Sequence, residues 1–469
     1  MTSSLADRLA AHGERIACAQ GDSVWSYARL LAMADSLVNT LKDRTLVALL
    51  PANDFTSLCV YVGCLQRKLP LLLLPSSIKP DALRETLAAY QPGSLFAPAG
   101  TLNTAQSLDC GAGYARYSLA ASDVVPHNDL ALLLTTSGST GSRKYVRLSH
   151  TNIFSNAYSI VTYLNITGDD RPITTLPFSY SYGLSIINSH LLAGATIILT
   201  EEPLVKRDFW DSLRQRRATT FGGVPYTYTM LRRLRFARME LPSIRYLTQA
   251  GGRLGEELHR EFALACADKG IGFVPMYGQT EATARMSYLA AEVSCRSIGS
   301  VGQAIPGGRF ELLDGAGNVI MDPDTEGELI YYGANVCLGY ASTAADLARG
   351  DENHGRLQTG DIARCDAAGN YYIVGRKKRF LKLAGNRVNL DELDSLLARE
   401  GFSAVSAGKD DALLVYTDRN DQDTLKCFLA NHTSLNKYAY KITRVPVIPR
   451  SDSGKVLYAK LESALERDC

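Results

Sequence analysis

The chain carries a short loop whose residue types suit the binding of phosphate. The stretch Leu132–His150 reads LLLTTSGSTGSRKYVRLSH, so hydroxyl residues and two glycines lie between an apolar run and a lysine. Glycine lets successive backbone N–H groups turn toward one anion, while hydroxyl groups and a lysine add donors and positive charge. A flexible Ser/Gly turn between two strands explains these residues equally well. The candidate phosphate-binding residues are Thr136, Ser137, Gly138, Ser139, Thr140, Gly141 and Lys144.

The spacing of this loop argues against a P-loop nucleoside triphosphatase. That motif, G-x-x-x-x-G-K-[ST], starts a helix directly at its lysine. Here Gly138 and Gly141 are three residues apart, and Lys144 begins the extended pattern KYVRLS. A helix is predicted only after this pattern, with Ser149 as its N-cap. One face of that helix carries the apolar residues Ile153, Ala157, Ile160, Val161 and Leu164.

The elements that position such a loop follow an α/β pattern. Strand-like apolar runs alternate with helical periodicity through roughly the first 290 residues, which predicts βαβ units and largely parallel sheets. The clearest unit runs from a strand at Ile244–Ala250, through a helix, to a strand at Ile271–Gly278. The loops that follow two neighbouring parallel strands lie at the same edge of the sheet, at the carboxyl ends of the strands, where ligands bind in such folds. After Ser300, short strands separated by Gly and Asn turns predict a small antiparallel sheet or barrel.

A change of pattern near residue 378 predicts a second domain. The basic cluster GRKKRFLK at Gly375–Lys382 precedes a helix that Asn389 caps, with Glu392 placed as in a capping box. By itself the cluster is also compatible with a nuclear-localisation or nucleic-acid patch. We therefore expect an N-terminal domain, residues 1–377, of mostly parallel sheets flanked by helices plus a small antiparallel β subdomain. A small, mobile α+β domain, residues 378–469, is expected to follow.

The composition excludes several classes of protein. A net charge of +2 with 21% charged residues gives no bulk attraction for nucleic acid or membrane surfaces. No apolar run reaches the ~20 residues that a membrane helix needs, and the N-terminus lacks the apolar core of a secretory signal. The ten cysteines are scattered without a C-x-x-C pair, which favours reduced thiols and a cytoplasmic protein.

Seven segments recur in one order along the chain. They are TTSGSTGSRK, LPFSYSYGL (Leu176–Leu184), AGGRL (Ala250–Leu254), YGQTEAT (Tyr277–Thr283), TGD (Thr359–Asp361), GRKKRFLKLAGNRVNLDELD, and PRSDSGKVLYAKL (Pro449–Leu461). This series resembles the adenylate-forming superfamily of acyl-CoA synthetases, carrier-protein adenylation domains and luciferases. The resemblance spans Leu132 to Leu461, and the first 130 residues carry no motif.

The resemblance implies ATP and Mg²⁺ as cofactors and a carboxylic acid as substrate. In that superfamily the carboxylate attacks the α-phosphate of ATP, pyrophosphate leaves, and a thiol then takes the acyl group. Because both reactants are anions, catalysis requires cationic and N–H donors, a metal and alignment. By resemblance, Lys455 bridges the carboxylate and the α-phosphate, Thr280 donates to the α-phosphate, and Glu281 binds Mg²⁺.

The same resemblance assigns the other site residues. Asp361 accepts from the ribose hydroxyls and Arg376 assists it; Tyr277 packs on adenine. Lys378 is the hinge, and the KLAGNRV loop around Gly385 lines the path of the thiol. The remaining nucleotide-binding residues are Gly251, Gly252, Gly278 and Gln279, and the substrate-binding residues are Tyr180 and Tyr182. Taken alone, Asp361, Arg376 and Lys455 are better explained as turn or surface residues, and only their place in the ordered series favours the functional roles.

Three positions depart from the superfamily pattern. Tyr145 stands where a glycine follows the phosphate-loop lysine, and it is expected to stiffen that loop. Arg379 replaces an acidic residue after the hinge, and Tyr458 replaces an arginine three residues after Lys455. The C-terminal portion is also shorter than is usual. These departures concern the fine geometry and the rate, and they leave the expected reaction unchanged.

The nature of the acid and of the thiol is only partly indicated. Amino-acid-activating relatives carry Phe-Asp where this chain has Phe178–Ser179, and a buried ammonium without a counter-charge is costly. A short or medium acyl, hydroxyacyl or aryl acid is therefore expected. The acceptor is coenzyme A or the phosphopantetheine of an acyl carrier protein. A non-catalytic nucleotide-binding scaffold is the alternative from another class, and Glu281 together with Lys455 argues against it.

Overall fold

The computed structural model describes residues 5–103, 107–135, 144–383, 386–409, 412–432, 440–450, 456–458 and 460–461. These residues form two compact units. Unit 1 comprises the described residues up to Arg309 together with Tyr331–Leu357. Unit 2 comprises Phe310–Ile330 and the described residues from Gln358 onward. The predicted division of the chain between residues 377 and 378 stays a prediction.

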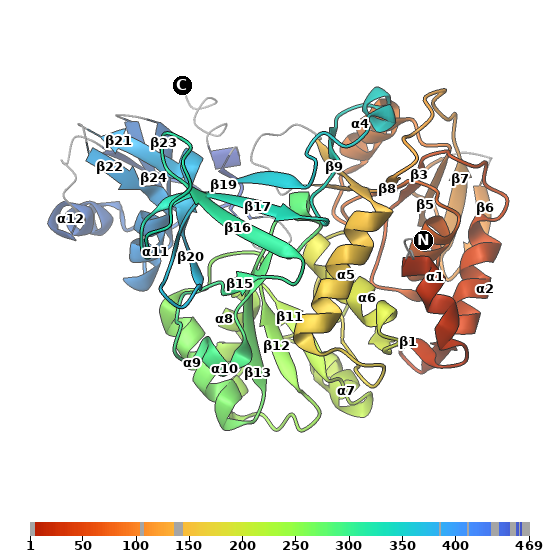
Figure 1. Cartoon of the computed structure of the whole chain (residues 1–469), viewed down its shortest axis with the longest axis horizontal. Coiled ribbons are helices and arrows are strands. Elements are labelled where there is room, and N and C mark those ends of the chain that lie inside the picture. Colours follow the sequence, from red (N-terminus) through yellow and green to blue (C-terminus); the bar gives the residue numbers. More distant parts are fainter. Residues whose placement is uncertain are drawn as a thin grey trace. The chain divides into compact units, whose positions relative to one another are not determined.

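Unit 1 contains an eight-stranded sheet with a parallel centre. Its central strands are all parallel, and the flanking strands pair antiparallel. The helices of this N-terminal region are α1 (Leu5–Leu9), α2 (Tyr27–Val38), α3 (Phe55–Gln66) and α4 (Pro80–Tyr90). The strand order is β18 (Gly339–Ala341), β9 (Tyr145–Ser149), β8 (Leu130–Thr135), β4 (Leu71–Leu73), β3 (Val47–Leu49), β5 (Ser94–Pro98), β7 (Tyr114–Ser118) and β6 (Ser107–Gly111) (Figure 1).

A second sheet of unit 1 contains the predicted βαβ unit. It has the order β11 (Thr220–Gly223), β12 (Tyr246–Gln249), β13 (Gly272–Tyr277), β14 (Ser287–Tyr288) and β15 (Gln303–Ala304). The first three strands are parallel, which confirms the unit predicted from the apolar runs. The helices around it are α7 (Arg207–Gln215), α8 (Pro225–Arg233), α9 (Glu256–Asp268) and α10 (Ala291–Ser294). A smaller sheet joins β10 (Ile197–Ile198), β1 (Ile16–Gln20) and β2 (Ser23–Ser26).

Two helices connect these sheets. Helix α5 (His150–Leu164) begins at the predicted cap, where Ser149 and Asn152 form a capping box. Helix α6 (Ser181–Leu192) is buried from Ser181 through Leu191, so it is packed against other elements on more than one face. Its residues Leu184 and Ile187 pack with the eight-stranded sheet, whereas Tyr182 and Ile186 pack with β12 and β13. The N-terminus of α6 is thereby fixed between the two sheets.

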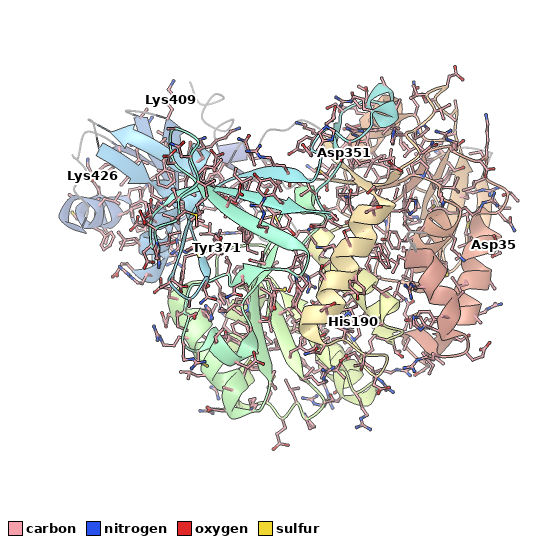
Figure 2. All side chains as sticks on the ribbon, viewed as in Figure 1. Asp35, His190, Asp351, Tyr371, Lys409 and Lys426 are labelled. Carbon is pink, nitrogen blue, oxygen red and sulfur yellow. The ribbon has the colours of Figure 1, made fainter. Side chains whose placement is uncertain are left out.

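The buried His190 of α6 has a structural role (Figure 2). Its Nδ1 donates to the carbonyl oxygen of Ile186 at 2.8 Å, and its Nε2 accepts from the hydroxyl of Tyr246 at 3.2 Å. Burial lowers the pKa of His190 to about 4, so the ring is neutral at physiological pH. Both ring nitrogens are therefore occupied by the packing of α6 on β12.

Unit 2 is built from strands that pair mostly antiparallel, and its described residues include two α-helices. Most of a four-stranded sheet belongs to it, with the order β16 (Gly308–Leu313), β17 (Gly327–Gly333), β19 (Arg356–Cys365) and β20 (Tyr371–Arg376). A hairpin of β21 (Phe380–Leu383) and β22 (Asn386–Asn389) leads to α11 (Leu390–Arg399), which Asn389 caps as predicted. The last sheet joins β23 (Ala404–Lys409), β24 (Ala412–Thr417) and β25 (Tyr440–Arg444), with α12 (Gln422–His432). In this sheet β24 and β25 are parallel.

The expected α/β class is confirmed, as are the small antiparallel sheet after Ser300 and the strand on each side of the phosphate-loop segment. Among the residues that the structure describes, no helix combines the length and the hydrophobicity that crossing a bilayer requires.

Candidate active site

Two of the predicted motifs lie at one edge of the second sheet. Strand β12 ends at Gln249, directly before the AGGRL segment, and β13 ends at Tyr277, directly before Gly278. The two strands are parallel neighbours, with Gln249 paired to Pro275. The loops therefore leave the sheet at the same edge, as the sequence predicted. The side chain of Gln249 donates to the carbonyl oxygen of Gly252 at 2.9 Å and holds the first loop in shape.

Glycine is required at one position in each of these loops. Gly251 has φ +83°, and a Cβ there would come within 2.4 Å of the Tyr180 hydroxyl oxygen. A Cβ at Gly278 would lie 1.7 Å from the carbonyl oxygen of Ala284, which no rearrangement of a side chain relieves. Both glycines thus permit a close approach of the backbone that a larger residue would block.

The turn that carries Glu281 is held by three hydrogen bonds to the segment that contains Asn335 and Cys337. The backbone carbonyl of Glu281 accepts from the N–H of Cys337 at 2.8 Å. Asn335 donates to the carbonyl of Ala282 at 2.9 Å and accepts, through its own carbonyl, from the Thr283 hydroxyl at 2.7 Å. Thr283 has φ +66°, a conformation that β-branched residues rarely adopt. Such strain persists where the surroundings fix it, and it concentrates at functional sites.

Tyr340 contacts two of the predicted site residues at once. Its hydroxyl donates to Oε1 of Glu281 at 2.9 Å, and Nζ of Lys144 lies 3.6 Å from the centre of its ring. Burial, and then the charge of Glu281, raise the pKa of Tyr340. In the described part of the chain, Oε2 of Glu281 has no hydrogen-bond partner. One carboxylate oxygen is thus held in place while the other is available to a cation.

Strand β18 fixes the position of Tyr340. The guanidinium of Arg147, which is fully buried on β9, donates to the carbonyl oxygens of Tyr340 and Leu338, at 3.0 Å each. It also forms an ion pair with Glu352 at 2.6 Å. Tyr145, at the start of the same strand, is buried with its ring edge-on to Tyr90, at 5.1 Å between ring centres. Tyr145, the first residue after Lys144, is therefore anchored in the core.

The aromatic segment at the start of α6 lies beside this turn. The hydroxyls of Ser181 and Thr280 are 3.2 Å apart, which links the segment to the predicted α-phosphate donor. The hydroxyl of Tyr182 is 2.8 Å from that of Thr248 on β12. Burial raises the pKa of Tyr180 to about 12, so both tyrosines are neutral hydrogen-bonding groups.

In unit 2, Asp361 and Arg376 occupy opposite positions on β19 and β20. Nε of Arg376 lies 3.6 Å from Oδ1 of Asp361, whose side chain is buried. The Thr359 hydroxyl donates to the carbonyl of Leu329 at 2.7 Å and accepts from the N–H of Asp361 at 3.1 Å. Gly360, at φ +73°, completes this turn. The structure thus brings together the two residues predicted to bind ribose.

The departures at Arg379 and Tyr458 meet in a single network of unit 2. The guanidinium of Arg379 lies 4.2 Å from the centre of the Tyr458 ring. Both side chains bind Oδ2 of Asp394, at 2.6 Å from Arg379 and 2.9 Å from Tyr458. Arg379 also pairs with Asp391 on the same helix. The short turn Lys377–Arg379, which contains the exposed Lys378, is therefore tied to α11 and to the segment that follows Lys455.

Comparison with known proteins decides the family. Residues 5–341 match the family profile described as AMP-binding enzyme. The chain belongs to the AMP-binding enzyme family. The resemblance found in the sequence motifs is confirmed by this match.

Individual relatives match most of the chain. The 2-succinylbenzoate–CoA ligase of Bacillus pumilus is 27% identical, with 96% of this chain and 95% of that protein covered. The medium-chain fatty-acid–CoA ligase of Escherichia coli is 26% identical, and the match covers 71% of this chain and 61% of that protein. The o-succinylbenzoate CoA synthetase of Bacillus subtilis, solved with its acyl-adenylate intermediate, superposes with a TM-score of 0.81 at 23% identity, covering 98% and 99% of the chains. This last likeness shows that the fold is shared.

Several predicted residues of the phosphate loop, the thiol-acceptor loop and the catalytic segment lie outside the described residues. They are Thr136, Ser137, Gly138, Ser139, Thr140, Gly141, Gly385 and Lys455. The roles of these residues, like those of the described ones, stay predictions.

Three residues that lie beside the predicted AMP-binding residues were not predicted from the sequence. Tyr340 and Asn335 are more than fifty residues from Glu281 along the chain and reach it because β18 pairs with β9. Neither belongs to one of the seven segments, so local spacing gave no indication of them. Ser181 lies inside the aromatic segment, and its place at the first position of a buried helix was the available signal.

Replacing Asp361 by alanine is expected to weaken AMP binding by about 1–3 kcal/mol, as for one lost charged hydrogen-bonding group. The ATP KM should rise in parallel. Calorimetry with AMP measures the change, and Asp322→Ala, an exposed aspartate of the same unit, is the matched control. Unchanged AMP affinity in a folded Asp361→Ala protein would exclude Asp361 from the ribose site.

Proposed function

We propose that the chain activates a small carboxylic acid with ATP, releases pyrophosphate, and transfers the acyl group from an acyl-adenylate to the thiol of coenzyme A. The chain is an AMP-forming acid–thiol ligase. The observation that carries this proposal is the contact of Tyr340 with two predicted site residues. The Tyr340 hydroxyl binds Glu281, in the loop that follows β13, and Lys144 lies over the Tyr340 ring. The chain in which these residues meet matches the AMP-binding family.

The proposed roles follow from the charges in the first half-reaction. The carboxylate and the α-phosphate repel each other, and negative charge develops on the phosphate oxygens as pyrophosphate leaves. Lys455 offsets the repulsion, Lys144 and the preceding loop hold the β- and γ-phosphates, and Thr280 donates a hydrogen bond. Hydrogen bonds to Asn335 and Cys337 hold the turn Thr280–Thr283, and this turn is proposed to position Thr280 before the substrates bind.

The surroundings of Glu281 fit Mg²⁺. This cation is usually held by one or two carboxylates together with substrate phosphates, and it keeps several waters. No group of three acidic, histidine or cysteine side chains forms a complete cage in the described ranges. Glu281 presents one oxygen without a described partner, as a site completed by phosphates requires. When bound, the metal neutralises charge on the phosphate oxygens.

The second half-reaction is proposed to use a different part of the C-terminal region. Lys455 acts on the carboxylate and phosphate, and the loop around Gly385 then admits the thiol. Rotation about Lys378 is the proposed means of exchanging the two. Residues 378–469 are proposed to move together in this rotation.

The acid is proposed to lack a free α-amino group. Phe178 is buried against Tyr61, with ring centres 5.6 Å apart, and the next residue is Ser179, so the segment offers no carboxylate to an ammonium. The named relatives act on acids as different as 2-succinylbenzoate and medium-chain fatty acids, so their names do not identify the acid. Tyr180 and Tyr182 are proposed to contact it.

Coenzyme A is the leading acceptor, since the curated relatives compared above are coenzyme A ligases. An acyl carrier protein is the second candidate, because it presents the same pantetheine arm. A cytoplasmic location is proposed from the scattered cysteines.

A panel of acids with two acceptors tests the proposal. Pyrophosphate release is measured for α-amino, acyl, hydroxyacyl and aryl acids, with coenzyme A or with a phosphopantetheinylated carrier protein. We expect release with non-amino acids, and thioester formation with coenzyme A. Release with free α-amino acids alone would contradict the proposed acid class, and thioester on the carrier protein alone would replace the acceptor. No release with any acid would favour a non-catalytic scaffold.

A further inference from the structure

A buried arginine lies among the residues proposed to contact the acid. Arg285 follows Glu281 by four positions, and its side chain is only 2% exposed. Its Nε donates to the Ser185 hydroxyl on α6 at 3.0 Å, and the guanidinium carbon lies 5.3 Å from the centre of the Tyr182 ring. Arg285 therefore joins the Glu281 turn to the aromatic segment.

The charge of Arg285 is not balanced by the protein. No carboxylate of the described residues lies within the 4.0 Å of an ion pair with its guanidinium, whereas the other largely buried arginine, Arg147, pairs with Glu352. Fully buried arginines are almost always paired, because removing a charge from water is costly. A missing anion is the simplest account of this difference.

The residues around Arg285 also leave some of its N–H donors without an acceptor. Nη1 donates to the Tyr163 hydroxyl at 3.1 Å and contacts the sulfur of Met276 at 3.4 Å. Within the described part of the chain, Nη2 has no acceptor. A guanidinium has five N–H donors in a planar fork that matches a carboxylate. The unpaired edge of Arg285 is thus suited to a second anionic group.

We infer that the acid carries a second carboxylate, or an equivalent anion such as a sulfonate, which pairs with Arg285. This inference rests on the proposed function and narrows it to a class of doubly anionic acids. One carboxylate reacts with the α-phosphate, and the other stays ionised on the guanidinium. The neutral hydroxyls of Tyr163 and Ser185 and the ring of Tyr182 contact the guanidinium and carry no charge that competes with the anion.

Matched acids test the inference on the wild-type protein. Glutarate is compared with pentanoate, adipate with hexanoate and with the neutral half-ester monomethyl adipate, and phthalate with benzoate. Pyrophosphate release gives kcat/KM for each acid. In at least one pair we expect the diacid to be preferred by about 10- to 100-fold, as for one charged hydrogen-bonded contact. A preference for the monoacid throughout would overturn the inference while leaving the ligase function intact.

Two variants distinguish binding from packing. Arg285→Gln should lower the diacid-to-monoacid ratio of kcat/KM by about 10- to 100-fold, and Arg285→Lys should restore part of it. Arg296→Gln, which removes an exposed arginine of the same unit, is the matched control, and its ratio should stay near the wild-type value. An equal loss for diacids and monoacids in Arg285→Gln would assign the arginine a packing role only. If that variant does not fold, the wild-type ratios decide, and no release from any acid would contradict both this inference and the proposed function.

Discussion

Replacing Lys455 by alanine is expected to slow acyl-adenylate formation by a factor on the order of 10²–10³, as for the loss of one strong electrostatic contact. An ammonium between two approaching anions gains interaction energy as charge moves onto the phosphate oxygens. It therefore favours the transition state over the bound substrates. The thiol in the second half-reaction attacks a neutral acyl carbon and has no such requirement. Given synthetic acyl-adenylate, Lys455→Ala should transfer the acyl group near the wild-type rate.

The two half-reactions are measured separately, by pyrophosphate exchange and by thioester formation from the synthetic adenylate. Lys426→Ala, which removes an exposed lysine of α12, is the matched control and should leave both rates unchanged (Figure 2). Normal pyrophosphate exchange in Lys455→Ala, or an equal loss of both steps in a folded protein, would show that another residue has this role.

Replacing Glu281 by glutamine is expected to lower pyrophosphate release by about 10²-fold and to raise the Mg²⁺ concentration needed for half-maximal rate. Glutamine keeps the shape and an acceptor for the Tyr340 hydroxyl but removes the negative charge that attracts the cation. Tyr340→Phe should have a smaller effect, about fivefold for one neutral hydrogen bond, because the carboxylate remains.

A magnesium titration of the initial rate compares these variants. Glu292→Gln on α10, an exposed glutamate of the same unit, serves as the control for lost charge. A Glu281→Gln protein with wild-type rate and wild-type metal dependence would remove Glu281 from the metal site.

Much of the framework was predictable because it is encoded locally. The caps at Ser149 and Asn389 follow from residue types within a few positions of one another, and the parallel pair β12–β13 follows from two apolar runs separated by one helical pattern. Each of the seven motifs is equally local, and their order along the chain led to the correct family.

The parts that were not predictable depend on long-range packing. Tyr340 reaches Glu281 only through the antiparallel pairing of β18 with β9, which no short pattern indicates. The departures at Arg379 and Tyr458 looked unrelated along the chain, yet both bind Asp394. Likewise, Arg285, which follows the Tyr-Gly-x-Thr-Glu motif, has no distinguishing feature in the sequence. Only its burial without a carboxylate partner in the described residues indicated that it binds an anion.

The central claim, that the acid is activated as an acyl-adenylate, is tested most directly by following carboxylate oxygen. The protein is incubated with ATP, Mg²⁺, coenzyme A and an acid labelled with ¹⁸O in its reactive carboxylate, and the products are examined by mass spectrometry. Attack of the carboxylate on the α-phosphate, followed by thiol attack on the acyl carbon, leaves one carboxylate oxygen on AMP. We therefore predict AMP with one ¹⁸O and unlabelled pyrophosphate. Label in inorganic phosphate together with ADP, or unlabelled AMP despite thioester formation, would contradict the proposed mechanism.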